Sequence, residues 1–507
     1  MGFNSFTFIL VFLPILLFGW YSLNRLQKYT LADALLVIMS LYFYYTFGVN
    51  FLIILAISIG VNYALSVLVN EIDSRDTAQN NLYKKLIKTI GVLFNLGLLF
   101  YFKYLGFFAD NLNAVFKTGI TVEQIIMPIG ISFFTFGQIS YIVDRTNNEA
   151  PHYSFIEYAL YTVYFPKLIQ GPIAFHKEMI EQFRDKSLRT YDSVKFAGGL
   201  MSFVIGLSKK VLLADIISRV VNYGFEQTYY LDTLTVIAVM LAYTFQIYFD
   251  FSGYCDMANG ISLMLGYKLP TNFNSPYKAA SAKELWQRWH MTLSRFFIKY
   301  VYIPLGGSRK GRYRTIANVL IVFILSGLWH GAGWTYVCWG LMQGLLVVWD
   351  DLGIVSVEKE GKFLFRKEPL LVIPRALGRA LTFTAFVVSL VFFRSESVEK
   401  ALAMFRRLFF FTYPGFLTRT ASNLDIAENY IFRQFLSQMG GINENVVYMI
   451  TMVIYLVVSG YIITRKNTQE IIEATTFDKK TLIGITVLFL WSFVSLSAVS
   501  TFIYFQF

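Results

Sequence analysis

Two histidines in apolar surroundings are the residues of this sequence best suited to acid–base chemistry. His330 lies in FILSGLWHGAGWTY (323–336), among apolar, aromatic and glycine residues. An ionisable side chain at membrane depth is a functional candidate by default, although a histidine that packs between helices is the competing explanation. Burial keeps an imidazole neutral, and a neutral imidazole can accept a proton. His290, in KELWQRWHMTLSRFF (283–297), is flanked by tryptophan, and a histidine in such a place is more often an anchor at the membrane interface than a functional residue.

A second polar cluster ends an apolar run at QIYFDFSGYCDMANG (246–260). Asp250 and Asp256 are costly near a bilayer, so they should face a cavity or a partner. Ser252 and Tyr254 belong to the same polar cluster. A structural polar network and a ligand-binding role are equally compatible with this pattern. No close group of histidine and carboxylate ligands is present, so we do not predict a metal site.

A basic segment follows at 299–314, and it contains no acidic residue. Its glycines at 306–312 resemble a phosphate-binding loop in spacing, but Arg312 and Tyr313 stand where such a loop needs lysine and serine or threonine. The backbone N–H groups could still bind an anion beside the basic side chains. The candidate cations are Lys299, Arg309, Lys310 and Arg312. Simple cytoplasmic topology explains the same charges, and both explanations can hold.

Composition indicates the kind of structure that must position these residues. Of the 507 residues, 56% are hydrophobic and only 15% are charged, whereas a soluble domain carries about 25% charged residues. The mean hydropathy is +0.52. The net charge of +12 comes mainly from short segments between apolar runs, which is the positive-inside pattern. We therefore predict an all-α protein that crosses the membrane several times, without a nucleic-acid partner.

The apolar runs predict about 11–13 transmembrane helices, with further re-entrant or amphipathic helices. The candidate spans are near 6–22, 31–46, 50–69, 88–108, 124–143, 154–170, 195–214, 232–250, 315–329, 333–350, 377–393, 445–464 and 481–503. We interpret the first run as a retained span with an outward amino terminus, because Arg25 and Lys28 follow it.

Two regions differ from simple spans. In YFPKLIQGPI (164–173), two prolines and a glycine interrupt an apolar stretch, and broken backbone at membrane depth must be buried in protein or line a wet cavity. In 251–312, the spacing of Trp286, Trp289 and His290 predicts one face of an amphipathic helix that lies against the membrane or the protein body.

Taken together, these runs resemble the membrane-bound O-acyltransferase family, in particular the bacterial membrane subunits for alginate and peptidoglycan O-acetylation. The resemblance rests on YFPKLIQGPI, IYFDFSGYCDMANGISLMLGYKLPTNFNSPY, LWQRWHMTLSRFFIKYVYIPLGGSRKG and LSGLWHGAGWTYVCWG, which cover most of 164–340. It implies a single membrane domain (1–507), in which amino-terminal helices (1–123), a catalytic core (124–350) and carboxyl-terminal helices (351–507) surround a central tunnel.

The resemblance also implies site residues. His330 becomes the expected catalytic base, and His290 the second site histidine, near the other end of the tunnel. Tyr504, in the terminal FIYFQF, becomes a possible acyl carrier. The candidate tunnel-lining residues are Asp250, Ser252, Tyr254, Trp289, Trp329 and Asn274. The basic segment 299–314 would hold the phosphates of coenzyme A by charge.

The implied reaction carries an acetyl group from cytoplasmic acetyl-CoA to an extracellular polysaccharide. Acetyl-CoA is a substrate here, and no bound cofactor is expected. The implied location is the bacterial inner membrane, and the implied partner is an extracytoplasmic transferase of SGNH-esterase type. The nearest alternative is a D-alanyl transfer protein for teichoic acid, with a carrier-protein thioester as donor. A transporter, or a non-catalytic export or scaffold subunit, is the alternative from another class.

Overall fold

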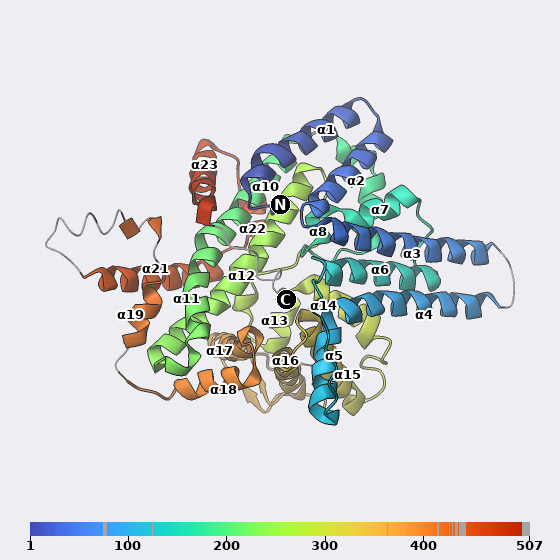
Figure 1. Cartoon of the computed structure of the whole chain (residues 1–507). Helices are drawn as coiled ribbons and strands as arrows, with labels where there is room; N and C mark the ends of the chain where they lie inside the picture. Colours follow the sequence, from blue (N-terminus) through green and yellow to red (C-terminus); the bar gives the residue numbers. More distant parts are fainter. Residues whose placement is uncertain are drawn as a thin grey trace. The chain divides into compact units, whose positions relative to one another are not determined.

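The computed structural model describes residues 1–74, 79–123, 125–361, 363–412, 415–424, 426–427, 429–430, 434 and 443–498. Most of the described residues are helical and very few are in strands, which confirms the predicted all-α class (Figure 1). The chain forms two compact units. Unit 1 comprises Met1–Phe203 and Tyr254–Thr271, and unit 2 comprises Val204–Gly253 and Asn272–Phe507.

Unit 1 contains the amino-terminal helices. They are α1 (Leu13–Arg25), α2 (Tyr29–Tyr45), α3 (Val49–Asp73), α4 (Asn80–Leu99), α5 (Leu105–Phe116), α6 (Ile131–Thr146), α7 (Phe155–Val163), α8 (Phe165–Leu168) and α9 (His176–Arg184). Two helices have residues in both units: α10 (Ser193–Ser208) and α12 (Thr233–Met264).

Unit 2 contains the remaining helices and a short parallel strand pair. The helices are α11 (Asp215–Glu226), α13 (Ala282–Arg288), α14 (Met291–Phe297), α15 (Arg312–His330), α16 (Trp334–Leu352), α17 (Arg375–Arg394), α18 (Val398–Arg407), α19 (Gly415–Ala421), α21 (Glu444–Thr464), α22 (Thr468–Ala474) and α23 (Lys479–Val494). The strands are β1 (Val355–Ser356) and β2 (Leu371–Val372).

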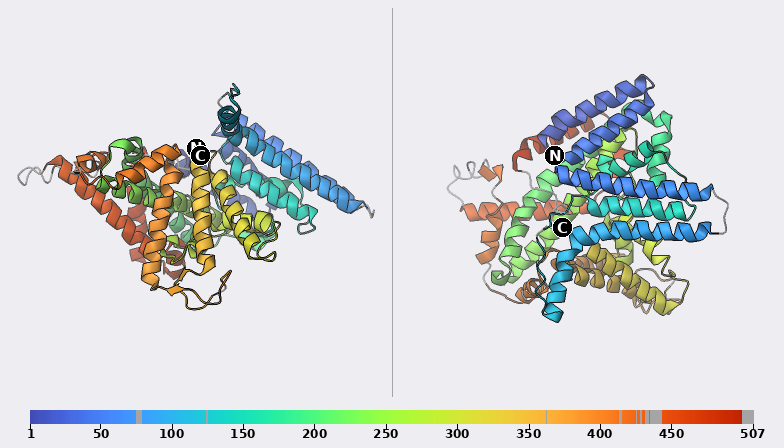
Figure 2. Two further views of the ribbon diagram at one scale, coloured as in Figure 1. Left: turned by 90° about the horizontal axis from the view of Figure 1, so that it is seen from below. Right: turned by 45° about the vertical axis from the view of Figure 1, so that its right-hand side comes forward.

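Within unit 1, α3, α4 and α6 lie side by side (Figures 1 and 2). Their contact contains a small apolar core, Val69, Ile87 and Ile142. It also contains a reciprocal amide pair, in which the side chains of Asn62 and Asn95 donate to each other over 3.3 and 2.7 Å. Amide pairs of this kind hold helices together inside a bilayer, where lipid offers no competing hydrogen bonds.

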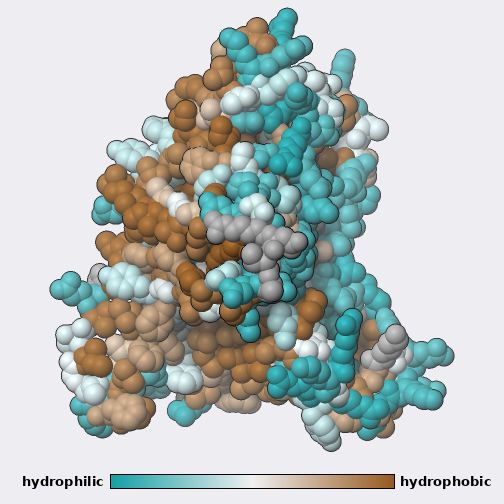
Figure 3. Space-filling view, turned by 90° about the vertical axis from the view of Figure 1, so that its right-hand side faces the viewer, coloured by the Kyte–Doolittle hydropathy of each residue, from teal (hydrophilic) through white to brown (hydrophobic). Residues whose placement is uncertain are grey.

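Seven helices in the described part of the chain are long and apolar enough to cross a membrane. They are Phe8–Arg25, Val49–Asp73, Asn80–Phe116, Thr233–Met264, Arg312–His330, Arg375–Arg394 and Glu444–Thr464. Apolar and hydrophilic side chains gather separately on the face drawn in Figure 3, as expected for a surface that faces lipid in part. The protein is therefore a polytopic membrane protein, as its composition predicts.

Several predicted spans are shorter or broken because polar or proline residues interrupt them. The 164–173 segment is fully buried, and its helix α8 covers only Phe165–Leu168. Gly171 follows, where a Cβ atom would lie 2.4 Å from the Cα of Lys167, so only glycine fits. The interpretation of this segment as broken backbone buried in protein is confirmed.

Candidate functional site

His330 lies at the end of α15, inside a cluster of aromatic rings in unit 2. Its side chain is 2% exposed. Ring centroids of Trp329, Trp339 and Phe393 lie 5.0, 5.2 and 5.2 Å from the imidazole centroid. These rings come from α15, α16 and α17, so three helices exclude solvent from one histidine.

Glycines allow α15 and α16 to pack closely enough to place His330. A Cβ atom at Gly327 would lie 2.2 Å from the backbone oxygen of Tyr336, and one at Gly331 would lie 2.1 Å from the ring of the same tyrosine. Both glycines therefore permit a close approach of Tyr336 that no other residue would allow. Gly333 differs, because a Cβ atom there would make only ordinary contact, at 3.6 Å.

His290 lies between two short helices rather than within one. Helix α13 ends at Arg288, α14 begins at Met291, and His290 has a φ of 45°. The prediction of one continuous amphipathic helix is therefore wrong. Non-glycine residues adopt this left-handed conformation at a cost, and the surrounding packing must hold them there.

The two histidines are neighbours. Their ring centroids lie 6.1 Å apart, and the centroid of Trp329 lies 5.8 Å from that of His290. The expectation that His290 lies near the other end of a tunnel stays a prediction, together with the tunnel itself. Forty positions separate the two residues, and the packing of α13 and α14 in unit 2 brings them together.

Asn272 fixes the tautomer of His290. The side-chain oxygen of Asn272 accepts hydrogen bonds from the backbone N–H and the hydroxyl of Thr292, at 3.3 and 2.9 Å. The same oxygen lies 3.2 Å from Nδ1 of His290. Because a backbone N–H can only donate, the Asn272 atom is an acceptor, and Nδ1 must carry the proton. The lone pair of the neutral ring is therefore on Nε2.

Nε2 of His290 has no hydrogen-bond partner among the described residues. The side chain is 0% exposed, and burial lowers the pKa of His290 to about 3. His290 lies outside the seven candidate spans. Because burial lowers its pKa this far, His290 is neutral at physiological pH, and its Nε2 can accept a hydrogen bond.

A cavity of about 870 Å³ opens in unit 2 behind the aromatic residues around the histidines. Gln343 and Phe386 form part of its lining. Gln343 accepts a hydrogen bond of 3.1 Å from Nε1 of Trp286, and the centroid of Phe386 lies 5.2 Å from that of Trp289. Trp286 in turn contacts Trp339, at 5.7 Å. A layer of tryptophan thus separates the cavity from His330.

Charged residues line this cavity in paired form. Lys283 Nζ lies 2.7 Å from Asp351, and both Arg288 and Arg375 contact Glu284, at 3.0 and 2.8 Å. The sequence did not identify these cations as cavity residues. Lys283 and Arg288 belong to the segment 283–297, which was interpreted as an amphipathic helix. The described lining contains none of the four predicted coenzyme A contacts, Lys299, Arg309, Lys310 and Arg312.

Asp250 belongs to a buried ion network. Lys210 Nζ lies 2.6 Å from Asp250 and 2.8 Å from Asp215, and all three side chains are at most 6% exposed. Lys210 stands in η4 (Lys209–Ala214), a π-helical stretch between α10 and α11. These ion pairs support the interpretation of Asp250 as part of a structural polar network. A lysine pair inside the apolar run 195–214 is the sequence signal that could have revealed this network.

The remaining predicted site residues are dispersed. Ser252 is buried in α12 within unit 2, whereas Tyr254, two residues later, belongs to unit 1, where its ring stacks on Phe3 at 4.9 Å. Asn274 lines the 870 Å³ cavity. Tyr504 lies outside the described residues.

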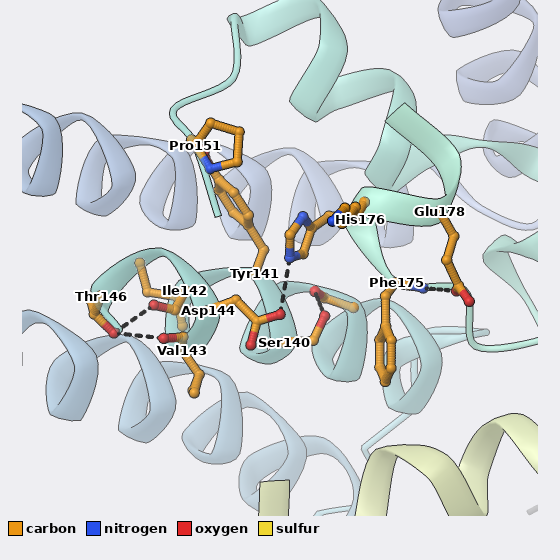
Figure 4. A network of polar contacts seen from close by, with 12 residues as sticks. Ser140, Tyr141, Ile142, Val143, Asp144, Thr146, Pro151, Phe175, His176 and Glu178 are labelled. Atoms are coloured by element: carbon orange, nitrogen blue, oxygen red, sulfur yellow. Dashed lines mark hydrogen bonds and ion pairs between the residues drawn. The ribbon is translucent and has the colours of Figure 1, made fainter. Parts of the chain in front are cut away.

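A third buried histidine has a structural environment in unit 1 (Figure 4). His176 begins α9, and its Nε2 lies 3.0 Å from a carboxylate oxygen of Asp144 on α6. Its Nδ1 lies 2.9 Å from the hydroxyl of Tyr153. The first contact joins α9 to α6 and the second joins α9 to the segment before α7, which agrees with a packing role for this residue.

Comparison with known proteins places the chain among acyltransferases. Residues 17–357 match the model of the membrane-bound O-acyltransferase family. A peptidoglycan O-acetyltransferase of Helicobacter pylori is 39% identical over 430 residues, which cover 80% of this chain and 79% of the relative. A Pseudomonas aeruginosa protein named "Probable alginate O-acetylase AlgI" is 36% identical over 419 residues, or 81% and 75% of the two chains.

A third comparison is more distant. A teichoic acid D-alanyltransferase of Streptococcus thermophilus is 29% identical over 295 residues, which cover 54% of this chain and 69% of the relative. The match of the family model to two thirds of the chain and the extent of the acetyltransferase similarities lead to one conclusion: this polytopic membrane protein is an acyltransferase that belongs to the membrane-bound O-acyltransferase family.

Proposed function

We propose that the protein moves an acetyl group from acetyl-CoA to a hydroxyl group of a polysaccharide on the other side of the membrane. The observation that carries this proposal is the buried pair of His290 and His330, whose centroids lie 6.1 Å apart. The names of the two acetyltransferase relatives support acetyl as the acyl group and a polysaccharide as acceptor. The D-alanyltransferase similarity covers less of the chain and is weaker.

The chemistry needs one base and one activated acyl donor. The oxygen of a hydroxyl group attacks the thioester carbonyl carbon, and His330 takes the hydroxyl proton. The C–S bond then breaks, and the proton passes to the departing thiolate, so the products are an ester and free coenzyme A. A positioned acid–base residue contributes about 10²–10⁴-fold to such a rate.

His290 is suited to orient the nucleophile. Its proton is held on Nδ1 by Asn272, so Nε2 can accept a hydrogen bond from the attacking hydroxyl group. The surrounding tryptophan rings exclude bulk water, which protects the thioester from hydrolysis.

The 870 Å³ cavity is the proposed approach for the donor, because it reaches the tryptophan layer beside both histidines. The basic segment 299–314 remains the proposed contact for the coenzyme A phosphates. Arg375→Gln tests the cavity and Arg309→Gln tests the segment. We expect each to raise KM for acetyl-CoA several-fold with little change in kcat. An unchanged KM in either variant removes that residue from the donor site.

We propose that Tyr504 carries the acetyl group as a phenolic ester between donor and acceptor. This relay would answer a topological problem, since acetyl-CoA is cytoplasmic and the polysaccharide is outside. The proposed location is the bacterial inner membrane. An extracytoplasmic transferase of SGNH-esterase type is the proposed next acceptor. Acetylation of the polysaccharide by the purified chain alone would contradict the need for that partner.

The deciding experiment uses the full chain in lipid nanodiscs with acetyl-labelled acetyl-CoA. Coenzyme A release and protein-bound label are followed in the wild type, His330→Ala and Tyr504→Phe. His152→Ala is the matched control, because His152 is a histidine of unit 1.

We expect the wild type and His152→Ala to release coenzyme A and His330→Ala to release at least 100-fold less. Label bound to wild type and absent from Tyr504→Phe supports the tyrosine relay. Full activity in His330→Ala contradicts the role of His330. Activity with a carrier-protein thioester but not with acetyl-CoA would replace the acetyl donor by the D-alanyl alternative.

A further inference from the structure

Unit 1 contains a second cavity, far smaller than that of unit 2 and of different chemistry. Its volume is about 410 Å³. The residues that line it come from the end of α1, the start of α2 and the segment before α10: Tyr21, Asn24, Arg25, Tyr29, Lys186, Arg189, Thr190 and Tyr191. None of these residues lines the cavity of unit 2.

Three cations and no carboxylate belong to this lining. Arg25 and Lys186 are exposed, and in the described part of the chain neither has a carboxylate partner. Arg189 is 5% exposed. Asp33, outside the lining, pairs with Arg189 at 2.9 Å. The remaining charge of the pocket is therefore positive and favours an anion.

Hydrogen bonds fix the guanidinium group of Arg189 and leave one of its N–H donors without a partner. Its terminal nitrogens donate to the backbone oxygens of Tyr29 and Phe183 and to Asp33. Its Nε–H is buried and has no partner among the described residues. A buried N–H without a partner costs free energy, which a ligand oxygen would recover. Phosphate oxygens suit a guanidinium group of fixed orientation.

The position of the pocket indicates where the anion comes from. Arg25 ends the first candidate span, Phe8–Arg25. Phe18, Leu26 and Leu31 are 78%, 64% and 53% exposed, so apolar side chains face outward beside the cations. A ligand here meets a charged pocket and an apolar surface together, as a lipid headgroup and its acyl chains would. Basic pockets at the ends of membrane helices bind headgroup phosphates in this way.

We propose that this pocket binds the phosphate group of an anionic membrane phospholipid. The phosphodiester accepts hydrogen bonds from Nε–H of Arg189 and from Lys186 and Arg25, while the acyl chains lie along the exposed apolar side chains of α1. A bound lipid would join α1 to the segment 186–191, in addition to the ring contact of Tyr21 and Tyr191 at 5.4 Å.

The test measures lipid binding to the purified, delipidated full chain by native mass spectrometry. Phosphatidylglycerol is compared with phosphatidylcholine of the same acyl chains. The variants are Arg25→Gln and Lys186→Gln, which change exposed cations. The control is Lys177→Gln, because the Lys177 side chain is a 72% exposed cation of the same unit outside the pocket. Circular dichroism confirms that each variant is folded.

We expect the wild type and Lys177→Gln to prefer phosphatidylglycerol, and each pocket variant to lose about fivefold in relative affinity. Equal binding of both lipids by the wild type overturns the proposal. An equal loss in Lys177→Gln does so too, because it shows only general charge attraction. The last measurement adds inorganic phosphate at millimolar concentration. If the phosphate displaces phosphatidylglycerol, the pocket is a site for a soluble anion and the proposal of a lipid site is overturned.

Discussion

The chemistry of His290 depends on one oxygen atom that is not part of a titratable group. Asn272 accepts three hydrogen bonds and thereby decides which nitrogen of the ring carries the proton. The loss of this acceptor releases the ring to the other tautomer, in which Nε2 is a donor. A neutral amide can therefore control acid–base chemistry at a distance from the reacting atoms.

Asn272→Leu tests this control. We expect acetyl transfer to fall by about 10²-fold, the lower part of the range for a positioned acid–base residue. Asn429→Leu is the matched control, because Asn429 is also buried in unit 2 and accepts from Thr451 at 2.8 Å. Initial rates in nanodiscs give the measurement. Equal losses in both variants would indicate general destabilisation rather than a positioning role.

The buried imidazole of His290 also makes stability depend on pH. Burial lowers its pKa from 6.5 to about 3, so between these values the unfolded chain binds a proton that the folded chain does not. Stability therefore falls as pH falls below about 6.5. At pH 4.5 the expected loss from this residue is about 2–3 kcal/mol.

His290→Asn removes this dependence while keeping the backbone conformation, because asparagine tolerates positive φ. We expect the difference in thermal midpoint between pH 7 and pH 4.5 to be smaller in His290→Asn than in the wild type. The opposite order would mean that the ring gains a stabilising partner when it is protonated.

The contact of α15 and α16 depends on glycines, which have no side chain to keep the two helices apart. Gly327→Ala places a methyl group 2.2 Å from a backbone oxygen, which cannot move without displacing α16. Overpacking of this kind costs about 1–3 kcal/mol. Gly333→Ala, where the nearest atom is at 3.6 Å and φ is −169°, should cost far less. Thermal unfolding of both variants checks the contrast, and equal midpoints would contradict it.

The buried network of Lys210 joins η4, α11 and α12. Lys210→Met leaves Asp215 and Asp250 without their shared cation, and we expect a loss of about 3–5 kcal/mol in unfolding free energy. Lys400→Met is the control, because Lys400 pairs with Glu396 at the surface, where such a pair is worth about 0–1 kcal/mol. Partial recovery in Lys210→Met/Asp250→Leu would show that unpaired charge causes the loss.

Local pattern and long-range packing explain which of these elements the sequence could predict. Gly171 and the prolines around it break a helix by their own stereochemistry, so the broken segment 164–173 was predictable. The break at His290 was not, because its sequence has good helical spacing. The side chain of Asn272, which lies 18 positions before His290, forms hydrogen bonds with Thr292 and His290 and stabilises the break. Contacts between residues so far apart in the sequence produce no periodic pattern.

The same distinction between local pattern and long-range packing holds for the protein overall. Composition and charge distribution predict a polytopic membrane protein, because the bilayer imposes length and polarity on every span. The sequence identifies His330 as a functional candidate because its neighbours in the chain are apolar. The cavity of unit 2 was not predictable, since its lining joins positions from Asn274 to Phe386. The division into three regions and the central tunnel remain predictions.

Helix α12 has a consequence for the lipid around the protein. Its 32 residues make a rod about 48 Å long, whereas the hydrocarbon core of a bilayer is about 30 Å thick. A helix of this length in contact with lipid would have to tilt strongly or project into water. For α12 the mismatch matters little, because 83% of its apolar window is buried in protein and does not face lipid. We therefore expect helices such as α21, with only 28% of its window buried, to set the membrane thickness that suits this enzyme. Bilayers of different thickness should strain helices such as α21 before they disturb the two buried histidines.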